Sequence, residues 1–85
     1  MTQFQRAVIS VVKTIAPGQT LSYAQVAQAA GYPGAARAVG SLMKSNTDSA
    51  VPCHRVIKSD GTPGDYNQGP AKKRARLLQE GANIR

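Results

Sequence analysis

Hydrophobic positions near the start of the chain recur at the spacing of an α-helix. They are Phe4, Val8, Val11, Val12 and Ile15. Such a stripe lies on one face of a helix and is most simply explained by packing in a core. Thr2 and Gln5 fit a capping box at the beginning of the segment, and Pro17 and Gly18 end it. The pattern predicts a helix over residues 3–15.

A second helix is predicted over residues 22–30. Ser22 and Gln25 form another capping-box pattern, while Leu21 and Val26 are placed for a hydrophobic staple. The expected inward face consists of Val26, Ala27 and Ala30.

Gly31 and the Tyr-Pro-Gly segment at residues 32–34 separate this helix from a third, predicted over residues 34–44. The expected inward positions of the third helix are Ala35, Ala38, Val39, Leu42 and Met43. Two short helices joined by a tight turn that contains glycine form the helix-turn-helix pattern.

The outward face of the third helix carries small side chains. They are Ala36, Gly40 and Ser41, with Arg37 and Lys44 beside them. Close packing against another helix is one explanation, because small side chains let two backbones approach. The functional explanation is a helix in a DNA groove with one long arginine reaching in. Since this face has few long polar side chains to read base edges, we expect weak or no sequence reading.

Beyond Asn46 the pattern changes. Val51, Val56 and Ile57 predict a short strand with Pro52 at its start, where a missing N–H is tolerated. The following segment, SDGTPGDYNQGP at residues 59–70, contains five Gly or Pro residues and predicts a loop.

A last helix is predicted over residues 70–80. Pro70 suits its first position and Gly81 its end. Its basic cluster consists of Lys72, Lys73, Arg74 and Arg76. These side chains form either a phosphate-facing patch or a solvated surface.

The elements predict a mainly α fold: a winged helix-turn-helix with a short β element and a C-terminal helix, in one domain spanning residues 1–85. A chain of 85 residues allows one small core. The single cysteine excludes an intramolecular disulfide. No apolar run approaches the roughly 20 residues of a membrane span, and the N-terminus lacks the apolar stretch of a signal peptide. We expect a cytoplasmic protein, nucleoid-associated in a prokaryote, with no membrane partner.

The charge balance is strongly basic. Eleven Lys and Arg stand against four Asp and Glu, a net charge of +7. Such a balance indicates either a polyanionic partner, most often nucleic acid, or a basic solvated surface. The aromatic residues are few, one Phe and three Tyr with no Trp, which argues against a stacking platform for single strands.

The only cysteine and the only histidine are neighbours, Cys53 and His54, in the segment AVPCHRVI. A histidine within reach of a thiol, directly or through one water, can take its proton and leave the nucleophilic thiolate. Adjacent residues of a regular strand point to opposite faces, so the pair requires a turn or a bridging water. A third group usually orients the histidine, and Glu80 is one of only four acids. A buried cysteine beside an exposed histidine is the alternative.

Five segments resemble successive motifs of the O6-alkylguanine-DNA alkyltransferase family, the methylated-DNA–protein-cysteine methyltransferases. They are FQRAV, PGQTLSYAQVA, GYPGAARAVGSLMKSN, PCHRVIKSDGTPGDY and LLQEG, in family order from Phe4 to about Gly81. The resemblance implies the family's C-terminal winged helix-turn-helix domain, which approaches the minor groove and flips the damaged nucleotide. It also implies double-stranded DNA containing O6-alkylguanine as the partner, a monomer, and neither cofactor nor metal.

The resemblance implies catalytic roles for five residues. Cys53 matches the alkyl acceptor, His54 the base that acts through a water, and Glu80 the acid that orients the histidine. Asn46 matches the asparagine that ties the turn to the active-site strand. Tyr23 matches the tyrosine that helps rotate the phosphate and donates to the base.

It also implies binding roles. Arg37 matches the finger that fills the space left in the base stack, and Ala36, Gly40, Ser41 and Lys44 share its DNA-facing helix. The positions that match the substrate pocket are Met43, Val56, Tyr66 and Asn67.

The sequence departs from the family pattern at several points. It begins at the FQ of the DNA-binding domain without the family's usual N-terminal domain, so we expect lower activity and stability. The stretch from Asn46 to Cys53 is one residue shorter, which affects the role expected of Asn46. Gln68 stands where the family tends to have glycine, with Pro70 beyond it, so we expect a different pocket lid.

Three functions are compatible with these features. The first is a single-turnover alkyltransferase that repairs O6-alkylguanine by moving the alkyl group to Cys53. The second is a lesion sensor like the alkyltransferase-like proteins, which have this short format, carry Trp in place of the acceptor Cys and pass lesions to excision-repair proteins. The third is a plain winged-helix DNA binder. We favour the first, because a sensor has no need of a nucleophile.

Overall fold

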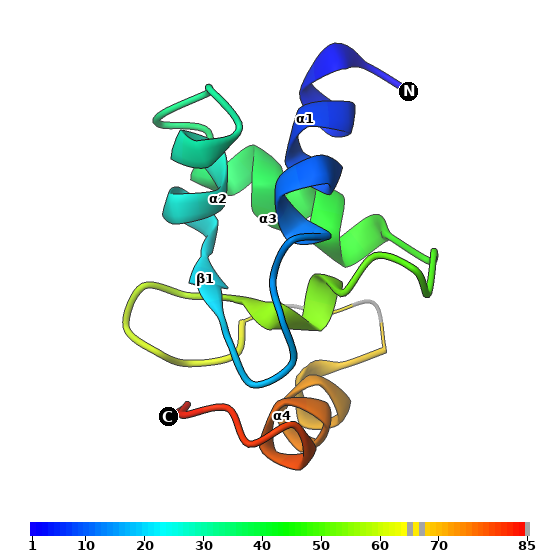
Figure 1. Cartoon of the computed structure of the whole chain (residues 1–85), viewed down its shortest axis with the longest axis vertical. Coiled ribbons are helices and arrows are strands. Elements are labelled where there is room, and N and C mark those ends of the chain that lie inside the picture. Colours follow the sequence, from blue (N-terminus) through cyan, green and yellow to red (C-terminus); the bar gives the residue numbers. More distant parts are fainter. Residues whose placement is uncertain (65, 67, 85) are drawn as a thin grey trace.

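The computed structural model describes residues 1–64, 66 and 68–84. Its elements follow the order α1 (Gln3–Val12), β1 (Leu21–Ser22), α2 (Tyr23–Ala29), α3 (Ala36–Ser45), the 3₁₀ turn η1 (Cys53–Arg55), β2 (Val56–Ile57) and α4 (Pro70–Gln79). The fold is mainly helical with one short sheet, as the pattern predicted (Figure 1). No helix among the described residues is long and apolar enough to cross a membrane.

Helix α1 begins where its capping box predicted and ends earlier than expected. Thr2 accepts a hydrogen bond from the Gln5 backbone N–H, and the Gln5 side chain accepts one from the Thr2 N–H. The helix stops at Val12 because the next residues change to tighter bonds: Thr14 N–H donates to Val11 O and Ile15 N–H to Val12 O. Ile15 therefore lies outside the helix but is still buried.

The helix-turn-helix is formed by α2 and α3. Ser22 and Gln25 make the predicted capping box, and Gly31 ends α2 with φ of 90°. The N–H of Gly31 donates to Gln28 O and that of Tyr32 to Ala27 O, which satisfies the last carbonyls of the helix.

Helix α3 begins two residues later than predicted, at Ala36. Gly34 has φ of 89°, a left-handed conformation that cannot belong to a right-handed helix. One expected inward position, Ala38, is exposed, whereas Val39 and Met43 are buried.

The prediction of a strand that includes Cys53 is wrong. Cys53, His54 and Arg55 form η1, in which the Arg55 N–H donates to Pro52 O at 3.0 Å, and only Val56 and Ile57 are strand. The strand β2 pairs with β1, Leu21–Ser22, which the sequence did not indicate as a strand. The two pair in parallel, Leu21 with Val56 and Ser22 with Ile57.

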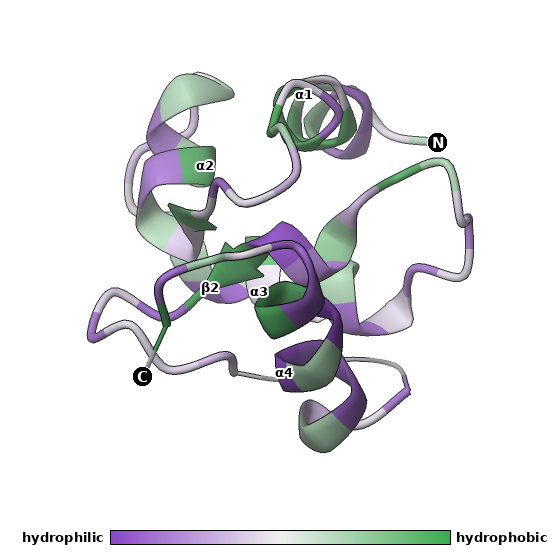
Figure 2. Ribbon diagram, turned by 60° about the horizontal axis from the view of Figure 1, so that its bottom comes forward, coloured by the Kyte–Doolittle hydropathy of each residue, from purple (hydrophilic) through white to green (hydrophobic). Residues whose placement is uncertain are grey.

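The core lies between α1, α2, α3 and β2. Its fully buried members include Val8, Val12, Val26, Val39, Met43 and Val56. Helix α4 is largely hydrophilic (Figure 2) and is anchored by Leu77, which packs against Ile57 and Ala82. Lys73 is also fully buried, so the two explanations of the α4 basic cluster do not apply to it.

Candidate active site and the groove along α3

The turn η1 presents Cys53 and His54 from consecutive positions. A 3₁₀ turn has three residues per turn, so neighbouring side chains are not forced to opposite faces as they are in a strand. Cys53 is a free thiol and His54 is buried beside it, each with 4% of its surface exposed. In a regular strand, Cys53 and His54 would point to opposite faces, and the 3₁₀ turn removes this restriction. The alternative of an exposed histidine does not apply.

His54 is joined to Glu80, the residue that ends α4. His54 Nε2 lies 3.0 Å from Glu80 Oε2. Arg55 donates from Nε to Glu80 Oε1 at 3.0 Å and from Nη2 to Oε2 at 2.7 Å. The third group sought from the sequence is therefore within hydrogen-bond distance of the imidazole, and an arginine shares it.

Burial and hydrogen bonding have opposite effects on the pKa of His54. Burial lowers the pKa of His54 below 6.5, although the hydrogen bond to Glu80 acts to raise it. The hydrogen bonds from Arg55 lower the pKa of Glu80 to about 2. Near neutral pH the network therefore contains a carboxylate and a neutral imidazole.

This protonation fixes the tautomer of His54. A carboxylate only accepts hydrogen bonds, so the ring hydrogen must be on Nε2. The other ring nitrogen, Nδ1, is then an acceptor. A base with this tautomer can take a proton directly or through a water.

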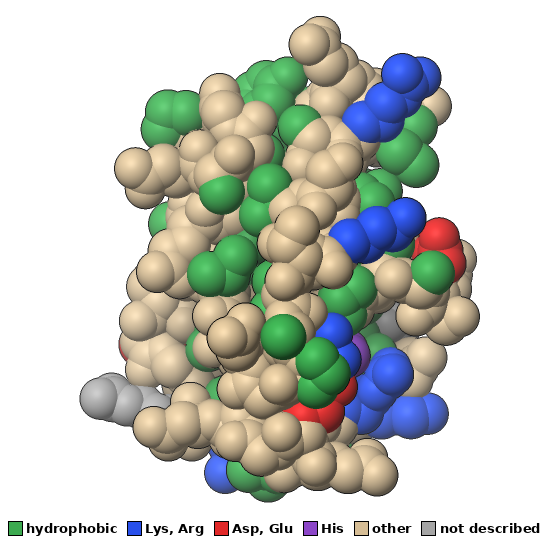
Figure 3. Space-filling view, in the orientation of Figure 1, with side chains coloured by type: hydrophobic (Ala, Val, Ile, Leu, Met, Phe, Trp, Pro, Cys, Tyr) green, Lys and Arg blue, Asp and Glu red, His purple; other side chains and the backbone are tan. Residues whose placement is uncertain are grey.

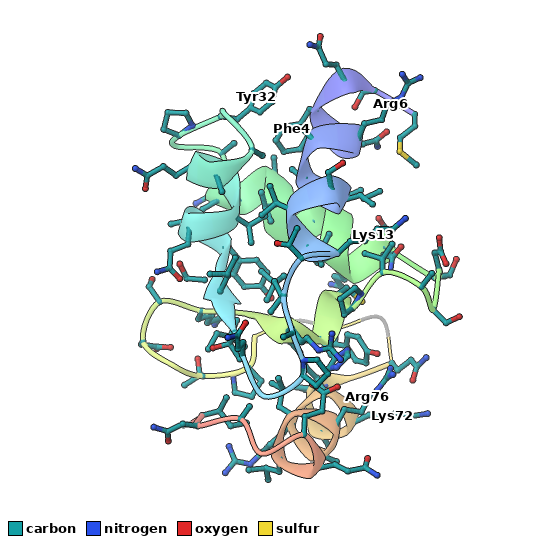
Figure 4. All side chains as sticks on the ribbon, in the orientation of Figure 1. Phe4, Arg6, Lys13, Tyr32, Lys72 and Arg76 are labelled. Atoms are coloured by element: carbon teal, nitrogen blue, oxygen red, sulfur yellow. The ribbon has the colours of Figure 1, made fainter. Side chains whose placement is uncertain are left out.

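A cavity of about 340 Å³ opens beside this network. Its lining includes five of the residues predicted from the sequence: Asn46, Cys53, His54, Tyr66 and Glu80. Lys13 and Arg76 approach it from the end of α1 and from α4 (Figure 4). In the face shown in Figure 3, the histidine is visible between basic side chains with an acidic side chain nearby.

Other predicted pocket residues lie elsewhere. Met43 and Val56 are buried in the core that also contains Cys53, and neither is among the described residues lining the cavity. Asn67 lies outside the described residues. Asn46 hydrogen-bonds within its own turn, with Nδ2 donating to Asp48 O at 3.1 Å and Oδ1 accepting from Asp48 N–H at 3.3 Å.

A second hollow, about 560 Å³, runs along α3. All five predicted DNA-facing residues line it: Ala36, Arg37, Gly40, Ser41 and Lys44. Lys58 adds a third basic side chain from the segment after β2. The small residues let a partner approach the helix backbone, while the basic residues suit an anionic one.

Tyr23 lies in this groove and not in the cavity of Cys53. It is the first residue of α2, and its hydroxyl accepts a hydrogen bond from Lys73 Nζ at 3.0 Å. The Lys73 ammonium also lies 5.3 Å from the centre of the Tyr23 ring. The buried lysine of α4 therefore supports a side chain at the edge of the groove.

Sequence reasoning missed three residues of these sites: Arg55, Lys58 and Lys73. Arg55 follows His54 directly, and its place in PCHR was the available signal. Lys73 differs from its basic neighbours by facing inward with Leu77, four residues later on the same side of α4. Nothing in the sequence distinguished Lys58.

Comparison with known proteins gives a consistent result. A family model described as the DNA-binding domain of 6-O-methylguanine DNA methyltransferase matches residues 3–82. The methylated-DNA–protein-cysteine methyltransferase of Shigella flexneri is 48% identical over 81 residues, which cover 94% of this chain and 47% of that protein. The protein of the same name from Methanothermobacter thermautotrophicus is 46% identical over 85 residues, 98% of this chain and 47% of its own. The chain thus spans about half the length of these curated relatives.

Solved structures share the fold. Mycobacterium tuberculosis OGT in complex with DNA superposes with a TM-score of 0.89 at 44% identity, over 95% of this chain and 51% of that one. S. pombe Atl1 in complex with damaged DNA containing O6-carboxymethylguanine superposes with a TM-score of 0.87 at 36% identity, over 100% of this chain and 82% of that one.

Proposed function

Because the chain belongs to the 6-O-methylguanine DNA methyltransferase family, we propose that it repairs O6-alkylguanine in duplex DNA by transferring the alkyl group to Cys53. The observation that carries the proposal is that Cys53, His54 and Glu80 line one cavity, with His54 hydrogen-bonded to Glu80. A free thiol adjoins a neutral imidazole whose outer nitrogen is held by a carboxylate. This is the arrangement that activates a nucleophilic cysteine.

The reaction requires no cofactor. His54 takes the thiol proton, directly or through a water, and the thiolate sulfur attacks the alkyl carbon in line with the C–O6 bond. The S–C bond forms as the C–O6 bond breaks, and the guanine leaves with the bonding electron pair. The released guanine takes up one proton, for which Tyr23 is the proposed donor. Tyr23 then regains a proton from solvent, while His54 releases the thiol proton to solvent, so both residues return to their starting states. The thioether is stable, so each molecule acts once.

The base must leave the duplex to reach this thiol, because Cys53 is almost fully buried. The groove along α3 is the proposed contact for the minor groove, where small side chains permit close approach. Arg37 is exposed in that groove and can fill the gap left by the extruded nucleotide. Asn46 is proposed to fix the turn before η1, and Met43, Val56, Tyr66 and Asn67 to shape the space around the base.

The test is the repair of the DNA itself. Duplex containing one O6-methylguanine is incubated with a molar excess of protein, and the nucleosides are quantified after digestion. We expect one guanine restored for each equivalent of protein consumed, with Cys53→Ala inactive. Persistence of O6-methylguanine with the folded wild-type protein would reject the proposal.

A lesion sensor is the second candidate. The observation that favours it is the similarity to Atl1, whose chain is matched over 82% of its length and is bound to damaged DNA. A sensor would bind O6-alkylguanine duplex more tightly than undamaged duplex while Cys53 stays unmodified, and excision-repair proteins would be its partners. Nucleoside analysis separates the two candidates, since only the alkyltransferase removes the lesion.

A further inference from the structure

The side chain of Arg55 donates three hydrogen bonds, to residues outside its own turn. Two of its nitrogens, Nε and Nη2, donate to the two carboxylate oxygens of Glu80. Its Nη1 donates to the backbone oxygen of Ile15 at 2.8 Å. The side chain is 15% exposed. A planar guanidinium with both oxygens of one carboxylate has a defined geometry that an ammonium cannot reproduce.

These bonds connect three segments distant in sequence. Arg55 belongs to η1, Ile15 to the turn after α1, and Glu80 to the end of α4. The backbone around Glu80 has little space, because a Cβ built on Gly18 would lie 3.0 Å from Glu80 O. Arg55 therefore holds the carboxylate of Glu80. Gly18 passes close to the backbone carbonyl of the same residue.

Glu80 Oε2 is the atom on which the network converges, since it lies close to both His54 Nε2 and Arg55 Nη2. A carboxylate alone beside an imidazole favours the protonated ring. A second positive charge on the same carboxylate opposes that effect. Burial is the largest cause that lowers the pKa of His54, and the charges of Arg76 and then Arg55 lower it further.

Other charged or titratable groups line the cavity beside His54. They are Lys13 after α1, Asp48 in the loop before η1, Cys53 and Arg55 in η1, Tyr66, and Arg76 and Glu80 of α4. Arg76 Nη1 donates a hydrogen bond to the Tyr66 hydroxyl at 2.6 Å. Among the described residues, Arg55 is the cation that pairs with Glu80.

We propose that Arg55 is a positioning residue of the alkyl-transfer site, which clamps Glu80 so that His54 presents Nδ1 as the acceptor for the thiol proton. The role in transfer rests on the function proposed above, whereas the effect on His54 does not. With Arg55 in place the imidazole is neutral and correctly turned. Without it, Glu80 is free to rotate and its undivided charge favours the imidazolium, which cannot accept a proton.

The first measurement is an NMR titration of the His54 ring, which is unambiguous because the chain has one histidine. The variants are Arg55→Met, Arg55→Lys and, as a matched control, Arg6→Met on the exposed face of α1. We expect a higher His54 pKa in Arg55→Met, a value near wild type in Arg55→Lys because the charge is kept, and no change in Arg6→Met. An unchanged or lower value in Arg55→Met would overturn the proposal. If that variant does not fold, Arg55→Gln replaces it.

The second measurement is the single-turnover rate of alkyl transfer against pH, corrected for the folded fraction. In Arg55→Lys, the fall of the transfer rate at low pH should occur at the same pH as in wild type. The rate itself should be roughly 10- to 100-fold lower, because lysine cannot make the two-nitrogen contact that orients the Glu80 carboxylate. Arg55→Met should in addition move this fall of the rate to higher pH. A wild-type rate for folded Arg55→Lys would reduce Arg55 to a structural role. If wild type itself transfers no alkyl group, the function fails, while the His54 titration still decides whether Arg55 controls the imidazole.

Discussion

The Glu80 carboxylate pairs with both His54 and Arg55, and these contacts make stability depend on pH. Its pKa falls from 4.5 to about 2 on folding, chiefly because of Arg55. A carboxyl with a depressed folded-state pKa stabilises the protein above pH 4.5, and the stabilisation is lost as the pH falls towards 2. The lowered pKa of His54 acts in the same direction below pH 6.5, since the unfolded chain takes up that proton more readily.

We therefore expect the free energy of unfolding to decrease continuously as the pH is lowered from 6.5 to 2. Urea denaturation at several pH values measures it. Glu80→Gln should flatten the part of the curve below pH 4.5. Equal acid sensitivity of Glu80→Gln and wild type would contradict the role given to the Glu80 carboxylate.

Tyr23 supplies a second test at the residue scale. Its hydroxyl accepts a hydrogen bond from the fully buried Lys73, so Tyr23→Phe removes a partner from a buried ammonium. We expect a loss of about 1–3 kcal/mol in the free energy of unfolding. Tyr32→Phe is the matched control, because Tyr32 contacts Phe4 through its ring and should cost much less. Similar losses in both variants would argue against the buried contact.

Single residues also show what the sequence could and could not predict about the site. Cys53 and His54 were candidates as neighbouring residues and Glu80 as one of four acids, a family resemblance assigned their roles, and all three line one cavity. The position of Arg55 in PCHR placed it beside His54, but its partners were not predictable, because Glu80 and Ile15 are 25 and 40 residues away. Lys73 was predicted to be exposed because it stands in a basic cluster, and its partner Tyr23 is 50 residues away.

At the scale of elements, local chemistry decides which predictions succeed. The beginnings of α1 and α2 were predictable because Thr2 and Ser22 cap their own helices. The pairing of Leu21–Ser22 with Val56–Ile57 was not predictable, since each strand has two residues and the partner is distant in sequence. The strand predicted through Cys53 failed because the hydrogen bond from Arg55 to Pro52 turns the backbone there.

Helix α3 offers a test in which stability and binding move in opposite directions. Gly40 faces the groove, and a Cβ there would meet the Tyr23 ring at an ordinary 3.9 Å. Gly40→Ala should therefore stabilise the protein by about 0.5–1 kcal/mol through helix propensity. The same methyl group should weaken DNA binding, because it reduces close approach to the helix.

Thermal unfolding and fluorescence anisotropy with a labelled duplex measure the two effects. Ala38→Ser, on the exposed part of the same helix outside the groove, should leave DNA affinity unchanged. Undiminished affinity in Gly40→Ala would show that the duplex does not lie against this face.

The molecule combines a strongly basic net charge with a groove along α3 and a separate cavity beside Cys53. The net charge of +7 predicts affinity for duplex DNA that falls steeply with salt. Lys44→Ala should reduce the slope of log K against log salt by about one, since Lys44 lines the groove. Lys72→Ala on α4 removes the same charge outside the groove and should change the slope less. Equal changes would indicate non-specific attraction to the whole surface.

The class of fold was predictable at this scale because helix spacing and caps repeat along the chain. The separation of the two hollows was not. Tyr23 lies in the groove with Arg37, whereas Cys53 lies in the cavity with Glu80. Under the proposed function, an extruded base therefore has to bridge them. In the proposed reaction, the Cys53 thiol reacts with a base brought to it in this way.

The most direct measurement is the intact mass of the protein after incubation with O6-methylguanine duplex, followed by peptide mapping. The account predicts the added mass of a single methyl group, located on Cys53, with no addition to Cys53→Ala under the same conditions. Tight binding of the duplex with an unmodified Cys53 would contradict it and would favour the lesion sensor.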